Sequence, residues 1–368
     1  TVQVCTLLSI KTGGCPEDCG YCSQSIHSDD PIEATPLMSL EEVKKQATLA
    51  RDQGSTRFCM GVAWRRPSNK NIDRVIKMID VVHDLGMESC VTLGMLSEDQ
   101  AVRLSKSGLN YYNHNVDTSR EYYTKVISTR NYQDRLNTLK YVRESGIKVC
   151  SGGILGLGES RDDRAKLLIE LANLDQHPES VPINMLVQME GTRLYENKKI
   201  DELEFVRTIA VTRIMMPNTY VRLSAGRESM AESMQALCFY AGANSVFYGE
   251  ELLTAPNVEV EKDRELFGKL GMKIEGDSDQ IDSLNDAPFQ PHTLELSTVY
   301  TYSGHLKHSG TNSTRLYIGD NTFAQVSRVN ILWDGNGNAT TSSSVVNATN
   351  FKISDEYNIG HEEIYWRI

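Results

Sequence analysis

The residues best suited to chemistry are the three cysteines of the stretch Cys15-Pro16-Glu17-Asp18-Cys19-Gly20-Tyr21-Cys22, which follow a C-x3-C-x2-C pattern. A proline and a glycine inside this stretch favour a loop over a helix or strand. Three thiolates this close together can bind three irons of a 4Fe–4S cluster and leave the fourth iron open to another ligand. The sequence therefore predicts an iron–sulfur centre at which a reaction can occur.

Zinc binding and disulfide formation are the two other uses that this loop could have. Structural zinc requires four protein ligands, and the nearest further candidate, His27, does not follow at zinc-finger spacing. The chain has eight cysteines, three of them in one loop, which indicates metal binding in a reducing compartment rather than a disulfide framework. We therefore expect a cytoplasmic protein.

Composition limits the partners of the chain. Its 368 residues are enough for one large domain and a smaller one, and its net charge of -11 makes nucleic acid an unexpected partner. No apolar run approaches the length that crosses a membrane, so we expect no membrane partner.

Strands and helices are predicted to alternate as far as residue 276. The first strand opens the chain, and a helix follows from Ser39 to about Gln53. Later strands are expected near 55–62, 87–94, 110–117, 147–155, 181–188, 219–226 and 243–249, and helices near 71–85, 97–107, 131–145, 160–174, 201–216 and 229–241. Eight such units predict an α/β fold, a closed (β/α)8 TIM-type barrel over residues 1–276 with its active site at the carboxyl ends of the strands. A doubly wound sheet is less favoured, because no dinucleotide glycine pattern follows the first strand.

Alternate residues of each strand face opposite sides, and in six strands one face is aliphatic. The other face is expected to point into the barrel, and it carries Cys59, Cys90, Cys150, Asn113, Asn115, Asp117, Asn184 and Arg222. Burying unpaired polar groups costs about 1–3 kcal/mol each, so a polar ligand should fill the lumen. A buried cysteine is often only a small hydrophobic residue, and this is what we expect of Cys5 and Cys238. Three cysteines on the same face of different strands instead indicate a second iron–sulfur centre.

The cysteine loop, with Tyr21 before its last cysteine, resembles the signature of radical S-adenosylmethionine (SAM) enzymes. Residues 2–276 as a whole resemble biotin synthases. The matching stretches are 15–24 (CPEDCGYCSQ), 55–61 (STRFCMG), 111–117 (YYNHNVD), 148–154 (KVCSGGI), 181–186 (VPINML) and 220–227 (YVRLSAGR).

This resemblance implies specific roles for the candidate residues. Cys15, Cys19 and Cys22 would bind the 4Fe–4S cluster, whose free iron binds SAM, and Cys59, Cys90, Cys150 and Arg222 would bind a 2Fe–2S cluster. Tyr21, Asn115, Asp117 and Ile154 would contact SAM, and Asn113, Asn115 and Asn184 would surround the ureido ring of dethiobiotin. Arginine is an unusual ligand, because its guanidinium is normally protonated and has no acceptor atom.

The resemblance also implies the reaction and the partners. The enzyme would insert sulfur from the 2Fe–2S cluster into dethiobiotin to form biotin, with electrons from a flavodoxin or ferredoxin and with help from iron–sulfur assembly proteins. Members carry helical turns before the first strand that contribute to a dimer; the printed sequence starts at that strand, so we expect a homodimer, but a weaker one. The alternatives are another radical SAM barrel of the mutase or maturase kind, or a non-catalytic fusion whose C-terminal part is a binding module.

Composition changes after Gly276. Residues 277–292 are expected to form a polar linker, and residues 293–368 a β-rich module of unknown function. Alternating runs at 294–300, 314–318 and 329–333, with turns at 319–321 and 334–337, predict antiparallel strands there.

Overall fold

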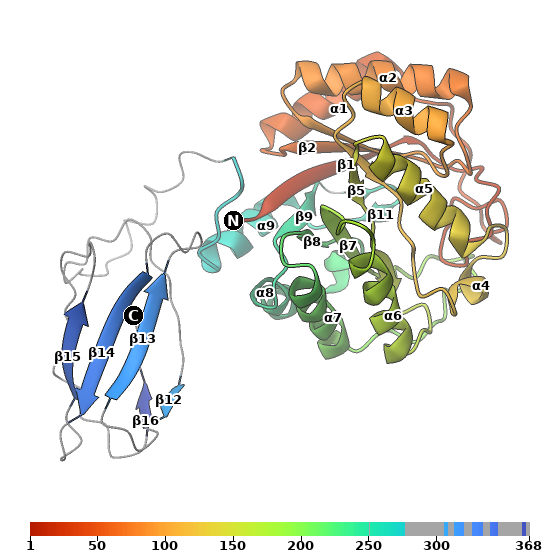
Figure 1. Cartoon of the computed structure of the whole chain (residues 1–368). Coiled ribbons are helices and arrows are strands. Elements are labelled where there is room, and N and C mark those ends of the chain that lie inside the picture. Colours follow the sequence, from red (N-terminus) through yellow and green to blue (C-terminus); the bar gives the residue numbers. More distant parts are fainter. Residues whose placement is uncertain are drawn as a thin grey trace. The chain divides into compact units, whose positions relative to one another are not determined.

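A computed structural model describes residues 1–249 and 251–276, together with five short stretches, 305–307, 313–319, 326–333, 339–344 and 363–365. The chain divides into two compact units, Thr1–Leu284 and Asn285–Ile368 (Figure 1). Among the helices that the structure describes, none is long and apolar enough to cross a membrane.

The described part of the first unit is built on a closed ring of eight parallel strands. These are β1 (Gln3–Lys11), β2 (Arg57–Val62), β3 (Glu88–Thr92), β4 (Tyr111–Asn113), β5 (Lys148–Cys150), β7 (Ser180–Met185), β8 (Tyr220–Leu223) and β9 (Ser245–Tyr248). Neighbours pair in chain order, β1 also pairs with β9, and Cys150 of β5 pairs with Ser180 of β7. These pairings confirm the predicted (β/α)8 barrel.

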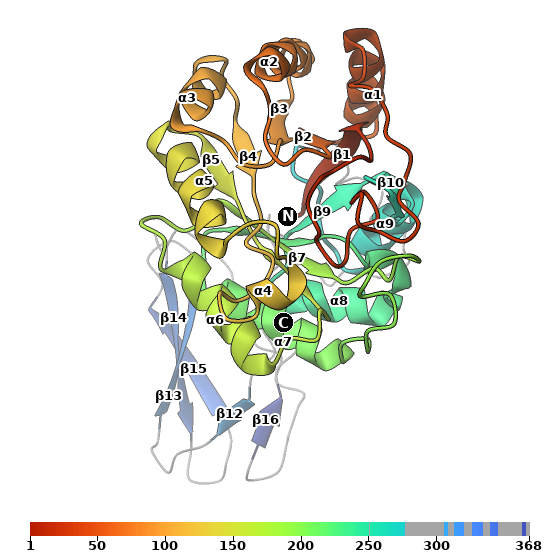
Figure 2. The same cartoon turned by 90° about the vertical axis from the view of Figure 1, so that its right-hand side faces the viewer.

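Helices surround the strands on the outside of the ring (Figure 2). They are α1 (Leu40–Asp52), α2 (Asn69–Asp84), α3 (Glu98–Lys106), α5 (Tyr132–Glu144), α6 (Arg161–Ala172), α7 (Glu202–Met215), α8 (Glu232–Tyr240) and α9 (Val260–Lys269). Serine side chains accept backbone hydrogen bonds at the starts of α1, α2, α3 and α6, which satisfies donors that a helix leaves unpaired. Helix α9 was not among the predicted elements.

The strand predicted near 147–155 is interrupted. It forms β5 and then β6 (Gly153–Leu155), which pairs with β7. A Cβ atom on Gly152 would lie 1.9 Å from the carbonyl oxygen of Pro182, so the two backbones meet at the interruption and only glycine fits there. The strand near 110–117 is likewise regular only as far as Asn113, and Asp117 takes a left-handed φ of 68°. Beyond this break, Asp117 forms an isolated bridge with Gly153 of β6.

Short elements connect the strands to the outer helices. They are α4 (Tyr123–Val126), the 3-10 helix η1 (Arg227–Ser229) and a small hairpin of β10 (Glu251–Leu252) and β11 (Ala255–Pro256). The chain also ties its first residues to the end of the barrel domain: Val2 donates to the carbonyl of Lys273 (2.7 Å), and Glu275 donates to the carbonyl of Val2 (2.8 Å).

The strand faces separate two kinds of interior. Phe58, Met60 and Val91 belong to the aliphatic core between strands and helices, as their parity predicts. The opposite parity forms a smaller buried cluster inside the ring, which contains four cysteines. The lumen is therefore chemically distinct from the core that holds the barrel together.

The second unit contains short antiparallel strands. They are β12 (His305–Lys307), β13 (Ser313–Gly319), β14 (Val326–Trp333), β15 (Ala339–Ser344) and β16 (Glu363–Tyr365), paired as β13-β14-β15 and β12-β16. The predicted runs 314–318 and 329–333 lie in β13 and β14, which pair with each other. The run 294–300 and the linker 277–292 lie outside the described residues.

Candidate active site

The cysteine loop follows the carboxyl end of β1. Three backbone hydrogen bonds fold this loop. The Cys15 N–H donates to the Gln24 carbonyl (2.9 Å), and the Ile26 N–H donates to the Cys15 carbonyl (2.9 Å). The Cys22 N–H donates to the Cys19 carbonyl (3.0 Å). All three cysteine side chains are free and half-buried. They are therefore held on a folded loop at the end of the barrel where this fold places its chemistry.

The thiols of this loop are poor free nucleophiles. Burial raises the pKa of Cys15 and of Cys19, and it raises the pKa of Cys22 to about 12. Because a thiol of such pKa stays protonated near neutral pH, the loop does not supply an activated thiolate on its own. Metal binding stabilises the thiolate form, so this environment suits cluster ligands better than a nucleophilic cysteine.

Two carboxylates within the loop anchor it to the segment after α4. Asp18 accepts from the backbone N–H groups of Ser128 (2.8 Å) and Thr129 (3.1 Å). Partial burial opposes ionisation, yet these hydrogen bonds lower the pKa of Asp18 to about 2. Glu17 is buried, accepts from the Thr129 hydroxyl and forms an ion pair with Arg65 (3.2 Å). The residues between the cysteines thus fix the loop in place.

Arg130 brings a positive charge to the loop. Its Nη2 donates to Cys19 Sγ (3.7 Å), and its Nε, which lies 3.8 Å from the Glu17 carboxylate, is buried without a hydrogen-bond partner among the described residues. A guanidinium here favours negative charge on the neighbouring sulfur. Arg130 was not among the site residues predicted from the sequence.

Asp117 forms a buried ion pair with Arg135 of α5, another residue that was not predicted as part of the site. Arg135 Nε donates to the Tyr123 hydroxyl (3.0 Å), and the Asp117 carbonyl accepts from the Ile154 N–H (2.8 Å). Burial raises the pKa of Tyr21, and the negative charge of Asp117 raises it further. This tyrosine therefore lies within electrostatic range of the Asp117–Arg135 ion pair. The sequence did contain a signal for Arg135: a cation on the apolar face of a helix requires a buried anion as its partner.

The three predicted asparagines line the strand ends above the lumen. Asn113 Nδ2 donates to Asn115 Oδ1 (3.3 Å) and to Cys150 Sγ (3.3 Å). Asn184 Nδ2 donates to the carbonyl of Gly153 (3.0 Å), and Asn115 Oδ1 accepts from the Gly152 N–H (3.1 Å). All three side chains are half-buried, so hydrogen bonds fix their orientation while part of each side chain is exposed to a ligand.

The lumen brings together the predicted cysteines of β2, β3 and β5. Cys59 of β2 and Cys90 of β3 are register partners, and both belong to the buried cluster inside the ring. Cys150 belongs to the same buried cluster, and each of the three is at most 3% exposed. Arg222 is also buried in the lumen.

Unpartnered polar atoms surround these cysteines. Among the described residues, Gln3 Nε2, Arg57 Nη1 and Ser180 Oγ are buried without hydrogen-bond partners. Arg57 and Ser180 are register partners of Cys5 and Cys150. Leaving such atoms unpaired is costly, and a sulfide-containing anionic cluster in the lumen could accept from them. The residues present therefore fit a 2Fe–2S cluster.

Charged and aromatic side chains seal the lumen at its amino-terminal end. Arg57 donates to Glu88 (3.0 and 2.8 Å) and lies 3.4 Å from the centroid of the Tyr111 ring. Lys148 lies 3.6 Å from Glu88, and the Tyr220 hydroxyl donates to Glu275 (2.9 Å). Arg57 and Tyr111 are buried, so these contacts cover the lumen at the end opposite the cysteine loop.

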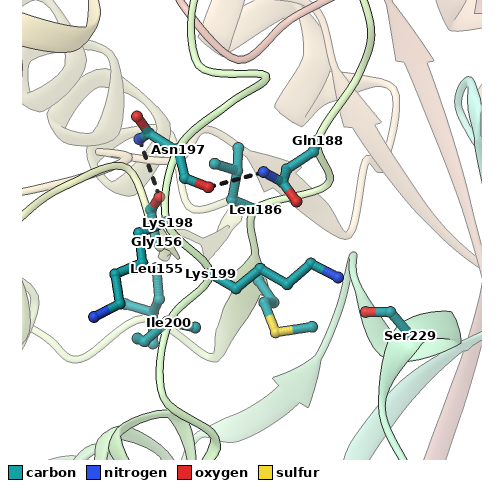
Figure 3. A pocket seen from close by; sticks show the side chains of 10 residues that line it. Leu155, Gly156, Leu186, Gln188, Asn197, Lys198, Lys199, Ile200 and Ser229 are labelled. Atoms are coloured by element: carbon teal, nitrogen blue, oxygen red, sulfur yellow. Dashed lines mark hydrogen bonds between the residues drawn. The ribbon is translucent and has the colours of Figure 1, made fainter.

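Two hollows open near the carboxyl ends of the strands. One is lined by Cys19, Cys22 and Arg193 among others. The other lies against Leu155 and Gly156, directly after Ile154 (Figure 3). There Asn197 donates to the Gly156 carbonyl (3.2 Å), Gln188 donates to the Asn197 carbonyl (2.8 Å), and Lys199 extends towards Ser229.

In the described residues, no three His, Cys, Asp or Glu side chains converge on a position for a single metal ion. The ligands of an iron–sulfur cluster instead bind irons at different positions in the cluster, so they are spread more widely. The predicted site residues therefore form two thiol groups, one in the loop and one in the lumen, with Asn113, Asn115, Asp117, Ile154 and Asn184 at the strand ends.

The fold and the loop together define a class of enzyme. Residues 9–171 match the family model "Radical SAM superfamily" and residues 182–273 match "Biotin and Thiamin Synthesis associated domain". Among solved structures, methylornithine synthase matches with a TM-score of 0.63 and 19% identity, over 74% of this chain and 83% of that one. A FeFe-hydrogenase maturase from Carboxydothermus hydrogenoformans matches with a TM-score of 0.65 and 20% identity, over 74% and 67%. These two likenesses show the radical SAM barrel fold alone.

Curated relatives define the family more narrowly. The biotin synthase of Thioalkalivibrio sulfidiphilus is 62% identical over 271 residues, which are 74% of this chain and 80% of the relative. The biotin synthase of Parvibaculum lavamentivorans is 61% identical over 272 residues, again 74% and 80%. The chain belongs to the biotin synthase family. It is a sulfur-inserting radical SAM enzyme whose cofactors are a 4Fe–4S cluster, a 2Fe–2S cluster and SAM.

Proposed function

We propose that the cysteine loop and the lumen form one active centre, in which this chain converts dethiobiotin to biotin. The observation that carries this proposal is the presence of two separate thiol groups in one barrel, one in the loop after β1 and one inside the strands. When bound, the 4Fe–4S cluster supplies the electron for SAM cleavage and the 2Fe–2S cluster supplies the sulfur.

Cys15, Cys19 and Cys22 are assigned to the 4Fe–4S cluster. The hydrogen bonds of Asp18 and the ion pair of Glu17 keep the loop in one conformation, and Arg130 offsets charge at Cys19. A loop fixed in this way would hold the cluster in one orientation, and the cluster would then bind the amino and carboxylate groups of SAM in one arrangement.

Asn115, Asp117, Tyr21 and Ile154 are assigned to SAM. The backbone hydrogen bond between Asp117 and Ile154 holds a carboxylate beside an apolar side chain, which suits the hydroxyl groups of a ribose and the face of an adenine. Arg135 is a positioning residue, because its buried ion pair with Asp117 holds that carboxylate in one orientation.

Asn113, Asn115 and Asn184 are assigned to the ureido ring of dethiobiotin. A cyclic urea presents N–H donors and a carbonyl acceptor, and side-chain amides offer both partners. Asn113 also donates to Cys150 Sγ. The same side chain can therefore position the substrate close to the lumen thiols.

Cys59, Cys90 and Cys150 are assigned to the 2Fe–2S cluster, and the family resemblance gives the fourth position to Arg222. The seal of Arg57, Glu88 and Tyr111 limits water and oxygen at the closed end of the barrel. Excluding both protects reactive intermediates from side reactions.

The enzyme acts on dethiobiotin and takes electrons from a donor protein. We propose a flavodoxin or ferredoxin as that donor, iron–sulfur assembly proteins as the source of the clusters, and a homodimer as the working form. Eight free cysteines in the chain support a reducing compartment, which we propose is the cytoplasm. We also propose residues 1–276 as the catalytic barrel, 277–292 as a linker and 293–368 as a β-rich module.

The test is to reconstitute the full chain anaerobically with iron and sulfide and to add SAM, a reductant and dethiobiotin. Biotin and 5′-deoxyadenosine are then measured together. Biotin formation dependent on all three additions is the expected result, and SAM cleavage without any biotin would overturn the proposal.

A further inference from the structure

A short segment after α4 lies along the cysteine loop and contacts both a carboxylate and a sulfur of it. Asp18 accepts from the backbone N–H groups of Ser128 (2.8 Å) and Thr129 (3.1 Å). The next residue, Arg130, donates from Nη2 to Cys19 Sγ (3.7 Å). This segment therefore does more than anchor the loop, because its last residue contacts a sulfur that is assigned to the 4Fe–4S cluster.

The side chain of Arg130 is enclosed together with that of Glu17. Their exposed fractions are 8% and 1%, and Arg130 Nε lies 3.8 Å from the Glu17 carboxylate. Among the described residues, this buried Nε has no hydrogen-bond partner. An arginine that only neutralises a carboxylate commonly forms two parallel hydrogen bonds with it. Arg130 instead directs its hydrogen bond to Cys19 Sγ, so its position serves the sulfur as well as the carboxylate.

The other cations near this sulfur are placed differently. Burial raises the pKa of Cys19, and among the nearby charges Arg130 opposes this rise most, followed by Arg135. Arg135 is already paired with Asp117, whose charge acts in the opposite direction. Arg65 lies at the same carboxylate as Arg130 but is 46% exposed, so solvent and salt weaken its field. Arg130 is therefore the cation that acts most directly on the Cys19 sulfur.

Reduction adds one electron, and therefore one negative charge, to an iron–sulfur cluster. Hydrogen bonds to the ligand sulfurs and buried positive charges favour the reduced form, so they raise the reduction potential. A buried carboxylate has the opposite effect, because it repels the added electron and little solvent screens the repulsion. The two buried side chains, Arg130 and Glu17, would therefore act in opposite directions on a cluster held by this loop.

We propose that Arg130 and Glu17 together set the reduction potential of the 4Fe–4S cluster: Arg130 raises it through its hydrogen bond to Cys19, and Glu17 limits that rise. Arg130 acts through a ligand sulfur, so it is a positioning residue and not a ligand. The donor protein supplies the one electron that the cluster gains, and no bond forms or breaks at either side chain. The inference rests on the proposed function, because it concerns the cluster assigned there to the loop.

The test is a redox titration of the reconstituted full chain, followed by electron paramagnetic resonance of the loop cluster, with no SAM or dethiobiotin added. Arg130→Met should lower the midpoint potential. A roughly tenfold weaker reduction equilibrium, or about 59 mV for one electron, is the expected size. Glu17→Gln should raise the potential instead. Equal potentials in the parent, Arg130→Met and Glu17→Gln would overturn the proposal.

Arg65→Met is the matched control, because Arg65 also lies beside Glu17 (3.2 Å) but is 46% exposed. It should shift the potential less than Arg130→Met does. Added salt should reduce the shift of Arg65→Met further and leave that of Arg130→Met nearly unchanged, because buried charges are screened less. An equal shift in the two variants would show that any cation beside the carboxylate has this effect, and would contradict a role for the hydrogen bond to Cys19.

Two further variants guard against misfolding, because Arg130→Met leaves the buried Glu17 charge poorly compensated. Arg130→Lys keeps the charge but loses the planar guanidinium, and its potential should fall less than that of Arg130→Met. The double variant Glu17→Gln/Arg130→Met buries neither charge, and its potential should lie between those of the two single variants. Circular dichroism of the cluster-free chains reports folding. A purely structural role would lower the iron content of the variants but leave unchanged the potential of the clusters that form.

Failure of the proposed function looks different from failure of this inference. If the parent forms no biotin while the potentials shift as expected, the proposed function fails and the role of Arg130 and Glu17 stands. If the parent forms biotin while the potentials do not differ, this inference fails alone. An unsubstituted chain in which no loop cluster assembles would contradict both.

Discussion

The two thiol groups of the barrel differ in how the chain builds them. The loop cysteines lie within eight residues of one another, half-buried on a segment that folds by its own backbone hydrogen bonds. The lumen cysteines come from β1, β2, β3 and β5 and are buried. The first group depends on one loop, whereas the second exists only when the strands pair in the correct register and the barrel closes.

This difference has a functional consequence. A site on one loop can assemble its cluster with little help from the far side of the barrel, while the lumen site loses its geometry if any contributing strand shifts. A one-residue shift would turn each lumen cysteine to the aliphatic face. The two sites should therefore respond independently to substitution, and unequally.

The largest expected effect is that of Cys19→Ala. Without this thiolate, SAM has no correctly placed iron, so 5′-deoxyadenosine should fall below detection by chromatography. The lumen cluster should remain visible in the absorption spectrum. Cys238→Ala is the control, and it should cleave SAM normally; an equal loss in both variants would mean that the effect is one of folding.

Cys90→Ala should separate the two sites in the opposite direction. SAM cleavage should stay within a few-fold of the unsubstituted chain, but biotin formation without added sulfide should be lost, because the sulfur source is no longer held. Iron analysis should show the loss of the smaller cluster alone. Biotin formed by this variant, or complete loss of its SAM cleavage, argues against Cys90 as a ligand of the sulfur source.

The sequence predicted the loop site more completely than the lumen. The C-x3-C-x2-C motif lies within eight residues, so it can be recognised without knowing the fold. Strand parity placed Cys59, Cys90 and Cys150 on the inner face, and the structure agrees. Cys5, which was predicted to be a packing residue, is buried in the same cluster. The position of Cys5 beside these cysteines depends on the register between β1 and its neighbours β2 and β9, which parity within single strands does not give.

The cations of the site were also hard to predict. Arg130 and Arg135 belong to a loop and a helix whose neighbours are far away in sequence, and only the closed barrel brings them to Cys19 and Asp117. The same holds for the interruption between β5 and β6. There the contact between Gly152 and Pro182, residues on different strands, decides where the regular strand stops.

Asp117→Asn should lower the stability of the folded barrel. It leaves the buried Arg135 guanidinium without its anion, and breaking a buried ion pair in this way costs about 3–5 kcal/mol. Urea unfolding of the cluster-free chain measures the loss. Asp73→Asn is the matched control, because Asp73 pairs with Arg103 while 63% exposed, and such pairs contribute at most about 1 kcal/mol. An equal loss of stability in both variants would show that the buried Asp117–Arg135 pair contributes no more than an exposed ion pair.

Asp18→Asn should have a smaller effect, and one that depends on pH. The pKa of Asp18 is lowered from an ordinary 3.8 to about 2 in the folded chain. A lowered pKa stabilises the fold above the unfolded value, so the contribution is present above about pH 4 and is lost as pH falls towards 2. Cluster-free Asp18→Asn should therefore be less stable than the parent near pH 6 and similar to it near pH 2. A difference that is constant over this range would contradict the mechanism.

The smallest expected effect is that of stopping the chain after Gly276. Every residue assigned to either thiol group precedes this point, and so do the contacts that join Val2 to Lys273 and Glu275. We therefore expect iron and sulfide content, SAM cleavage and the 2Fe–2S spectrum to be unchanged. A chain stopped after Gly271 is the control, since it also loses Lys273 and Glu275, and with them the hydrogen bonds that fix the first residues of β1, the strand that pairs with β2 and its Cys59. That shorter chain should lose the lumen cluster before the loop cluster, because only the lumen depends on the register of β1. Collapse of both clusters on stopping at Gly276 would instead make the later residues part of the barrel's own fold.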